Sequence, residues 1–180
     1  MKSINLIQNI IDQIKEAQLK LGYVEETIRL YFPRESINSI LHTDYAESES
    51  LLAELQKDPI FSKSILGELS FRLQQNRIEV RIPSQGAKYV KENIQDPVFL
   101  KEFIDLFAQN HHLTIDEIQG CFERFSSDYI CEKMGDDNEF DYVVYFVDES
   151  IDAYRYCIKT EMGHTVYHRF TKEDYERLIS

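Results

Sequence analysis

The spacing of the hydrophobic residues changes along the chain, and this change limits the folds that the sequence can adopt. In the N-terminal part, apolar residues often recur at steps of three and four, as in Ile7, Ile10, Ile11 and Ile14, which is typical of helices with one buried face. After Asp128 they mostly alternate, which is typical of strands. Helices and hairpins follow one another too irregularly for a parallel βαβ fold, so the sequence predicts the α+β class.

The N-terminal half is expected to hold helices, one strand and one hairpin. The segment 69–82 has the alternation of a hairpin with its turn at Gln75-Asn76. Counting outward from this turn places apolar residues opposite one another on one face and Arg72 opposite Glu79 on the other, so two patterns agree on one register. The other elements expected here are a strand at Thr27–Phe32 and helices at Ile4–Leu21, Glu35–Leu41, Ala46–Lys57 and Ala87–Ile94.

The C-terminal half is expected to form an antiparallel meander with flanking helices. Pro97 and Thr114 are placed to begin two of these helices, and Thr171 is placed to cap the last one. No linker rich in Pro, Gly or Ser interrupts the chain, so we expect a single α+β domain over residues 1–180, in which the meander and the separate hairpin pack with several helices. The expected strands are Tyr129–Lys133, Tyr142–Val147, Ala153–Thr160 and Thr165–Phe170, and the expected helices are Val98–Gln109, Ile115–Phe125 and Thr171–Ile179.

The chain is acidic, with 32 Asp and Glu against 20 Lys and Arg and a formal net charge of −12. Nucleic acids and anionic lipids bind to clustered basic residues, so this charge argues against both as partners. No window approaches the ~20 apolar residues of a membrane span, and the interrupted stretch Ile4–Ile14 does not fit a signal peptide. Cys121, Cys131 and Cys157 lack the spacing of a disulfide framework, so we expect a cytoplasmic protein.

The motifs of the familiar enzyme classes are missing from the sequence. The six glycines are isolated, so the sequence contains neither the glycine-rich motif of a dinucleotide-binding loop nor that of a P-loop, and no cofactor is predicted. The acidic run 135–141 departs from the calcium-loop pattern and is expected to be a solvated turn, with divalent-ion binding as the alternative. His111 and His112 are expected in a polar loop, and His164 and His168 would lie about 13 Å apart on one strand. No metal site is therefore predicted.

One pair of residues could carry nucleophilic chemistry. If the last hairpin turns at Met162-Gly163, Cys157 lies directly opposite His168, within reach for an imidazole to lower the pKa of the thiol. This register would shift by one residue if the glycine formed a bulge. Neither an orienting third residue nor an oxyanion donor can be recognised. Cys157 and His168 are therefore catalytic candidates only under the alternative hypothesis of a small hydrolase or transferase.

Tyrosines gather in the same region, where seven of the eleven follow Asp128. In the hairpin register described above, Tyr154, Tyr156 and Tyr167 lie on the face opposite to that of Cys157. Tyrosine suits a protein interface because it offers a stiff contact area with a polar tip, and it equally suits a sheet covered by helices of its own chain. The favoured hypothesis is a cytoplasmic binding or regulatory domain that acts through protein contact or self-association, with these tyrosines as the binding surface.

Five segments of the chain carry a resemblance to a known family: Lys20–Tyr23, Glu26–Tyr31, Tyr142–Phe146, Tyr154–Cys157 and Tyr167–Tyr175. They resemble the bacterial family catalogued as domain of unknown function 3877, and the resemblance spans essentially the whole chain. It implies a single-domain cytoplasmic protein. It implies no activity, so no functional residue is carried over from the family.

Overall fold

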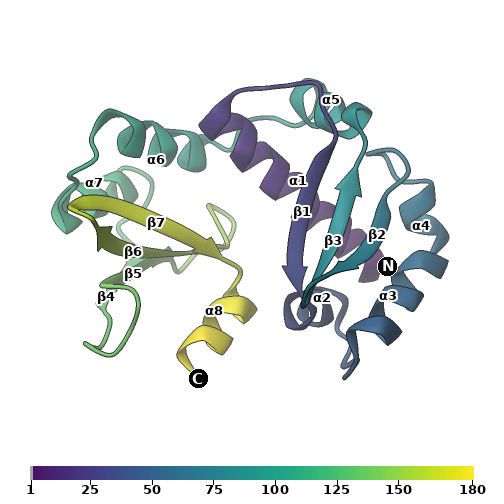
Figure 1. The fold of residues 1–180 in the computed structure, drawn as a ribbon. Helices are drawn as coiled ribbons and strands as arrows, with labels where there is room; N and C mark the ends of the chain where they lie inside the picture. The colour runs from purple at the N-terminus through teal and green to yellow at the C-terminus, as the bar shows by residue number, and fades with distance from the viewer. Residues whose placement is uncertain (1) are drawn as a thin grey trace. The chain divides into compact units, whose positions relative to one another are not determined.

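A computed structural model describes residues 2–180 of the chain, and Figure 1 shows its ribbon. These residues form helices and two antiparallel sheets, one of three strands and one of four, which confirms the predicted α+β class. The chain divides into two compact units, of which the first ends at Asp96 and the second begins at Pro97. The single domain over residues 1–180 stays a prediction.

The first unit is built around a three-stranded sheet whose central strand pairs with both neighbours. The strand order is β1-β3-β2, and all pairs are antiparallel. The β2–β3 hairpin has the predicted register, with Arg72 opposite Glu79, and β1 adds a third strand to it. The elements of this unit are α1 (Lys2–Leu21), β1 (Ile28–Pro33), α2 (Arg34–Leu41), α3 (Ser48–Lys57), α4 (Pro59–Ser62), β2 (Ser70–Gln74), β3 (Arg77–Ile82) and α5 (Ser84–Asn93).

One face of this sheet forms the core of the first unit. Ile78, Val80 and Ile82 of β3 are fully buried on this face, because side chains two residues apart on a strand point to the same side. Helix α1, which runs behind the strands in Figure 1, contributes Ile10 and Ile14 to the same hydrophobic cluster. The polar residues that alternate with these apolar ones therefore lie on the other face of the sheet.

Several helices begin or end one or two residues from the predicted positions, helix α5 begins three residues earlier than predicted, and helix α4 is an addition to the predicted elements. Helix α5 begins at Ser84 and includes Gly86, whereas the sequence predicts that this helix begins at Ala87. A side chain at Gly86 would meet the side chain of Ile82 at 2.5 Å and the carbonyl oxygen of Leu66 at 2.7 Å, so this glycine permits close packing within a helix. The short helix α4 was not predicted; it forms because the Asp58 carboxylate accepts a hydrogen bond of 3.0 Å from the Ile60 amide.

The second unit contains the predicted meander, with strand order β4-β5-β6-β7. The last hairpin has the predicted register, and Cys157 pairs with His168 in it. Met162 and Gly163 both have positive φ, so the turn adds no bulge and the register does not shift. The elements of this unit are α6 (Val98–Gln109), α7 (Ile115–Glu123), β4 (Tyr129–Lys133), β5 (Tyr142–Phe146), β6 (Arg155–Glu161), β7 (His164–Phe170) and α8 (Lys172–Ile179).

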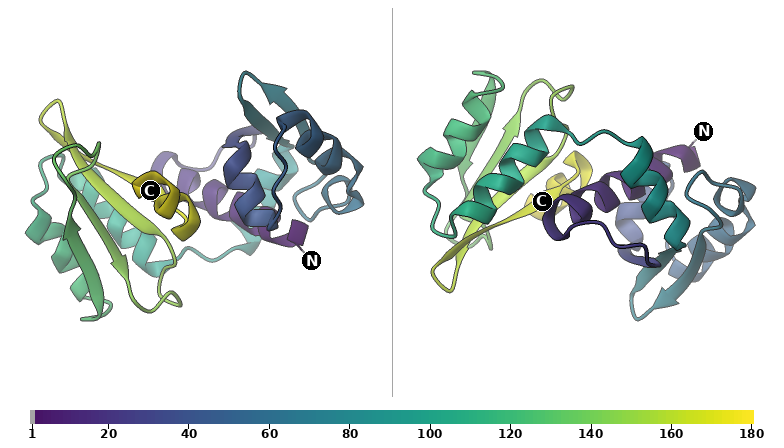
Figure 2. Two further views of the ribbon diagram at one scale, coloured as in Figure 1. Left: turned by 90° about the horizontal axis from the view of Figure 1, so that it is seen from below. Right: turned by 90° about the horizontal axis from the view of Figure 1, so that it is seen from above.

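Helices cover both faces of the meander (Figure 2). On one face, Phe99 and Phe103 of α6 and Phe122 of α7 pack against strand residues, with Phe99 4.7 Å from Phe146 between ring centroids. On the other face, Tyr175 of α8 packs against the smaller cluster that includes Cys157. The predicted capping box of Thr114 and Glu117 begins α7. Both faces of the C-terminal sheet are therefore at least partly closed by this unit itself.

We expect Met162→Asn to raise the free energy of unfolding by about 0.5–1 kcal/mol. Met162 is 96% exposed and has a φ of 50°, a left-handed conformation that asparagine tolerates better than methionine does. Chemical denaturation of the two proteins measures the change. As a control, Gly163→Ala should destabilise the protein, because the φ of 79° at this position is strained for any side chain. An unchanged or lower stability of Met162→Asn would contradict this account of the turn.

Candidate functional site

The structure places Cys157 and His168 opposite each other, as the sequence predicts, but in different environments. Cys157 is a residue of β6, and its side chain is fully buried in a cluster with Phe140 and Val143. The imidazole of His168 is exposed and lies against the rings of Phe140 and Phe170. Burial raises the pKa of the Cys157 thiol to about 12, which is the opposite of what an activated nucleophile requires. This geometry does not favour the hydrolase or transferase hypothesis.

We predict that Cys157 reacts slowly with iodoacetamide at pH 7, because a pKa of about 12 leaves roughly one thiolate per 100,000 thiols. Mass spectrometry of the alkylated peptides measures the rate. The half-buried Cys131 serves as the internal reference and should react faster. A rapid reaction at Cys157 that slows in His168→Ala would contradict this prediction and restore the nucleophile hypothesis.

The structure places the three candidate tyrosines in contact with their own unit. Tyr156 is fully buried, and its ring packs 4.7 Å from Phe103 of α6 between centroids. Tyr167 is half-buried and lies 5.0 Å from the same phenylalanine. The guanidinium of Arg169 lies over the Tyr154 ring at 3.6 Å. Tyr156 is thus unavailable to a partner in this structure, because its ring packs against Phe103 of α6 and Phe122 of α7.

A buried polar cluster lies beside these tyrosines. The Tyr156 hydroxyl donates a 2.9 Å hydrogen bond to Oδ2 of Asp152, and the Tyr154 amide donates one of 2.9 Å to Oδ1. Arg169 Nη2 lies 3.7 Å from the same carboxylate, and both charged side chains are about 95% buried. Each tyrosine in the cluster therefore has a structural role at the start of β6.

We predict that Tyr156→Phe lowers the free energy of unfolding by about 1–3 kcal/mol, because the buried carboxylate of Asp152 loses a hydrogen bond. Thermal or chemical denaturation measures this change. Tyr175→Phe is the control from the same unit, since no hydrogen bond to its hydroxyl is present among residues 2–180, and its stability should stay within about 0.5 kcal/mol of the parent. Equal stabilities of the two variants would contradict the role assigned to the hydroxyl.

Three histidines that the sequence left in separate segments come together at the tip of the last hairpin. The ring of His164 lies 5.3 Å from that of His112, with the two planes stacked, and 5.8 Å from that of His111. Nδ1 of His112 makes a 2.7 Å hydrogen bond to the Gly163 carbonyl, and the Thr165 amide donates to the His111 carbonyl at 2.8 Å. Within residues 2–180, no group of three or more His, Cys, Asp or Glu side chains is arranged to hold a metal ion. These histidines hold the hairpin against the loop between α6 and α7.

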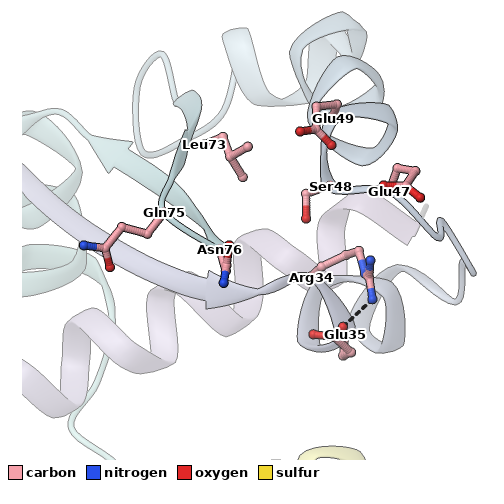
Figure 3. A pocket seen from close by; sticks show the side chains of 8 residues that line it. All are labelled: Arg34, Glu35, Glu47, Ser48, Glu49, Leu73, Gln75 and Asn76. Atoms are coloured by element: carbon pink, nitrogen blue, oxygen red, sulfur yellow. Dashed lines mark hydrogen bonds and ion pairs between the residues drawn. The ribbon is translucent and has the colours of Figure 1, made fainter.

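A polar hollow of about 380 Å³ lies beside the β2–β3 turn (Figure 3). Three glutamates line it together with Arg34, whose guanidinium is already paired with Glu35. The carboxylates come from α2 and from the start of α3, and Arg34 is the only basic residue among those that line the hollow. We therefore assign no ligand to this hollow.

The outer face of the N-terminal sheet collects basic residues that come from three strands. In the ladder, Arg29 of β1 lies opposite Arg81 of β3, Tyr31 lies opposite Glu79, and Glu79 lies opposite Arg72 of β2. The next pairs along the same face join Pro33, Arg77 and Gln74. We call this surface the arginine face, and its members are Arg29, Tyr31, Pro33, Ser70, Arg72, Gln74, Arg77, Glu79 and Arg81.

A buried glutamate organises the centre of the arginine face. The Glu79 side chain is fully buried, and its Oε2 accepts a 2.8 Å hydrogen bond from Nη2 of Arg72. Arg81 Nη2 lies 3.7 Å from Oε1, which receives no hydrogen bond from the described residues. The hydrogen bond from Arg72 and the charges of nearby guanidiniums hold the pKa of the Glu79 carboxyl below its ordinary value. Glu79 thus stays ionised and holds two arginines close to the sheet.

Two arginines of this face have no such partner. Arg29 and Arg77 are exposed, and neither makes an ion pair with a carboxylate within residues 2–180. Tyr31 lies between them and is 44% exposed. The charge of Arg29 contributes to the lowered pKa of Glu79, but Arg29 and Arg77 are free in the sense that neither guanidinium is in an ion pair among residues 2–180. These two free arginines lie on either side of an aromatic ring.

The sequence analysis did not predict the arginine face, although it predicted two features of the strands that form it. The alternation of β1 and the Arg72–Glu79 pair were both visible in the sequence, but the pairing of β1 with β3 was not. The signal that could have found the site is the count of charges by segment: residues 1–96 hold 12 basic and 14 acidic side chains, whereas residues 97–180 hold 8 and 18. The acidic excess lies mainly in the second unit, so the overall charge hides a basic face in the first.

Comparison with known proteins supplies a family and no activity. No curated protein and no solved structure matches the chain. None of the helices formed by residues 2–180 combines the length and the apolar character needed to cross a membrane. One family matches residues 3–179, nearly the whole chain, and the chain belongs to it: Domain of unknown function, E. rectale Gene description (DUF3877).

Proposed function

We propose that this protein is a cytoplasmic binding domain that acts through contact with an acidic partner protein, and that the arginine face is its contact surface. The observation that carries the proposal is the gathering of four of the nine arginines on one exposed sheet face of a chain with a net charge of −12. A surface of the opposite sign to the rest of the molecule selects and orients an acidic partner. The family is bacterial, and the three cysteines are unpaired, which supports the cytoplasm as the compartment.

The pairing of two arginines in the ladder is expected to lower the stability of the sheet, and this supports a role of the face in binding. Arg29 and Arg81 lie directly opposite each other in the ladder, and like charges at such positions destabilise a sheet. Glu79 is the only acidic residue on the face, so it neutralises one of four positive charges. An acidic partner that covers the face would remove the remaining repulsion. Local features that cost stability are expected mainly at functional sites.

The tyrosine surface that the sequence suggested is less suited to this role. Tyr156 is in the core, and Tyr154 is covered by the Arg169 guanidinium. The arginine face needs no rearrangement to meet a partner, because Arg29, Tyr31 and Arg77 are exposed. The geometry therefore favours the N-terminal sheet as the contact surface.

The double variant Arg29→Glu/Arg77→Glu tests the proposal with a fluorescent decaglutamate peptide as the probe. We expect the parent protein to bind the probe at low salt, and the variant to bind it at least about tenfold more weakly, because each exposed ion pair contributes a factor of about two to five and reversal adds repulsion. Fluorescence anisotropy at several salt concentrations measures the affinity.

The matched control is Lys63→Glu/Lys91→Glu, which changes the net charge by the same amount at exposed lysines outside the sheet. This control should bind the probe nearly as well as the parent does. Equal losses in both variants, or tighter binding of a single-stranded oligonucleotide of the same length than of decaglutamate, would overturn the proposal. Light scattering of the parent and the variant reports self-association; an assembly lost only in the arginine variant would identify a second copy as the acidic partner.

A further inference from the structure

We infer that the arginine face takes an extended segment of its partner in which two acidic residues are four positions apart and the residue midway between them is not acidic. This inference rests on the proposed function, because it names the chemistry of the partner at the same surface. It follows from three features of the face: the positions of its free arginines, the side chains between them and the buried charge beneath.

The two free arginines lie at opposite ends of adjacent strands, Arg29 on the edge strand β1 and Arg77 on the central strand β3. Arg29 is opposite Arg81, which is four residues along β3 from Arg77. Four residues of a strand span about 13 Å, and adjacent strands are about 4.8 Å apart, so the two Cα atoms are separated by about 14 Å. In an extended segment, residues four positions apart are also about 13 Å apart and point to the same side. Two acidic residues at this spacing therefore match the separation of the two arginine positions on the sheet.

The other two arginines are already engaged. Arg72 donates to Glu79 at 2.8 Å, and Arg81 lies 3.7 Å from the other oxygen of the same carboxylate. A ligand that used these groups would have to compete with a buried anion. The free positive charge of the face is therefore concentrated at Arg29 and Arg77.

The space between the free arginines excludes a third acidic group. The direct line between them crosses the ladder position where Tyr31 lies opposite Glu79. The ionised carboxyl of Glu79 would repel a carboxylate placed there, whereas the exposed ring of Tyr31 offers a contact for an apolar or aromatic side chain. The same ring hinders the two guanidiniums from converging on one small anion such as phosphate.

This spacing also separates a peptide from a nucleic acid. Each strand of a DNA duplex carries one phosphate per about 3.4 Å of helix axis, so a strand that reached both arginines would place further phosphates over Glu79. The chain as a whole has a net charge of −12, which disfavours the approach of a long phosphate backbone to the face. An acidic peptide segment with a neutral centre avoids both penalties.

Two heptapeptides of identical composition test the inference with the full-length protein. The first is Ser-Glu-Ser-Leu-Ser-Glu-Ser, which has its glutamates four positions apart, and the second is Ser-Ser-Glu-Leu-Glu-Ser-Ser, which has them two apart. We expect the first to bind at least about threefold more tightly, since only it reaches both free arginines. NMR titration measures the affinities, and the shifted backbone amides should belong to β1 and β3.

The variant Arg29→Gln/Arg77→Gln should abolish the difference between the two peptides, and its own spectrum shows that it is folded. Equal affinities of the parent for both peptides, while decaglutamate still binds through the arginines, would overturn the spacing inference and leave the proposed function standing. If neither heptapeptide nor decaglutamate binds, both proposals fall. Shifts confined to residues outside β1, β2 and β3 would likewise overturn the inference.

Discussion

The central position of strand β3 is the constraint on which the first unit and its candidate site depend. Its residues Ile78, Val80 and Ile82 are fully buried on one side, so the pleat of the strand directs Arg77, Glu79 and Arg81 to the other side. Pairing with β1 and β2 then aligns the side chains of three strands in rows. A shift of one residue in either ladder would bury arginines and expose isoleucines, so the hydrophobic core itself maintains the arginine face.

The second unit depends on a different interaction, the packing of aromatic rings between helices and sheet. Phe99 contacts the rings of Phe122, Phe146 and Tyr156, all within 5.6 Å between centroids. Edge-to-face contacts of this kind add to the large apolar area that each ring buries. Tyr156, one of the tyrosines that suggested an interface on this sheet, is buried in this core. The Cys157 thiol on the other face is buried by apolar neighbours.

The two units therefore differ in what they leave for function. In the meander, the aromatic and buried polar residues stabilise the unit itself. The Asp152 carboxylate, for example, accepts hydrogen bonds from the Tyr156 hydroxyl and from the Tyr154 amide. The N-terminal sheet presents exposed arginines on one face, where Arg29 and Arg81 form a like-charged pair in the ladder. The proposed binding function rests on this basic surface in a chain of opposite net charge.

The sequence alone determined the fold class and much of the local structure, because these follow from short-range rules. Alternation set the registers of both hairpins, including Arg72 opposite Glu79 and Cys157 opposite His168, and capping residues such as Thr114 set helix boundaries. Only the tertiary structure decided that β1 pairs with β3, since that pairing joins segments about fifty residues apart and no local pattern encodes it. It also decided which face of each sheet was covered, and with it whether a tyrosine, a thiol or an arginine meets solvent, because burial depends on elements distant in sequence.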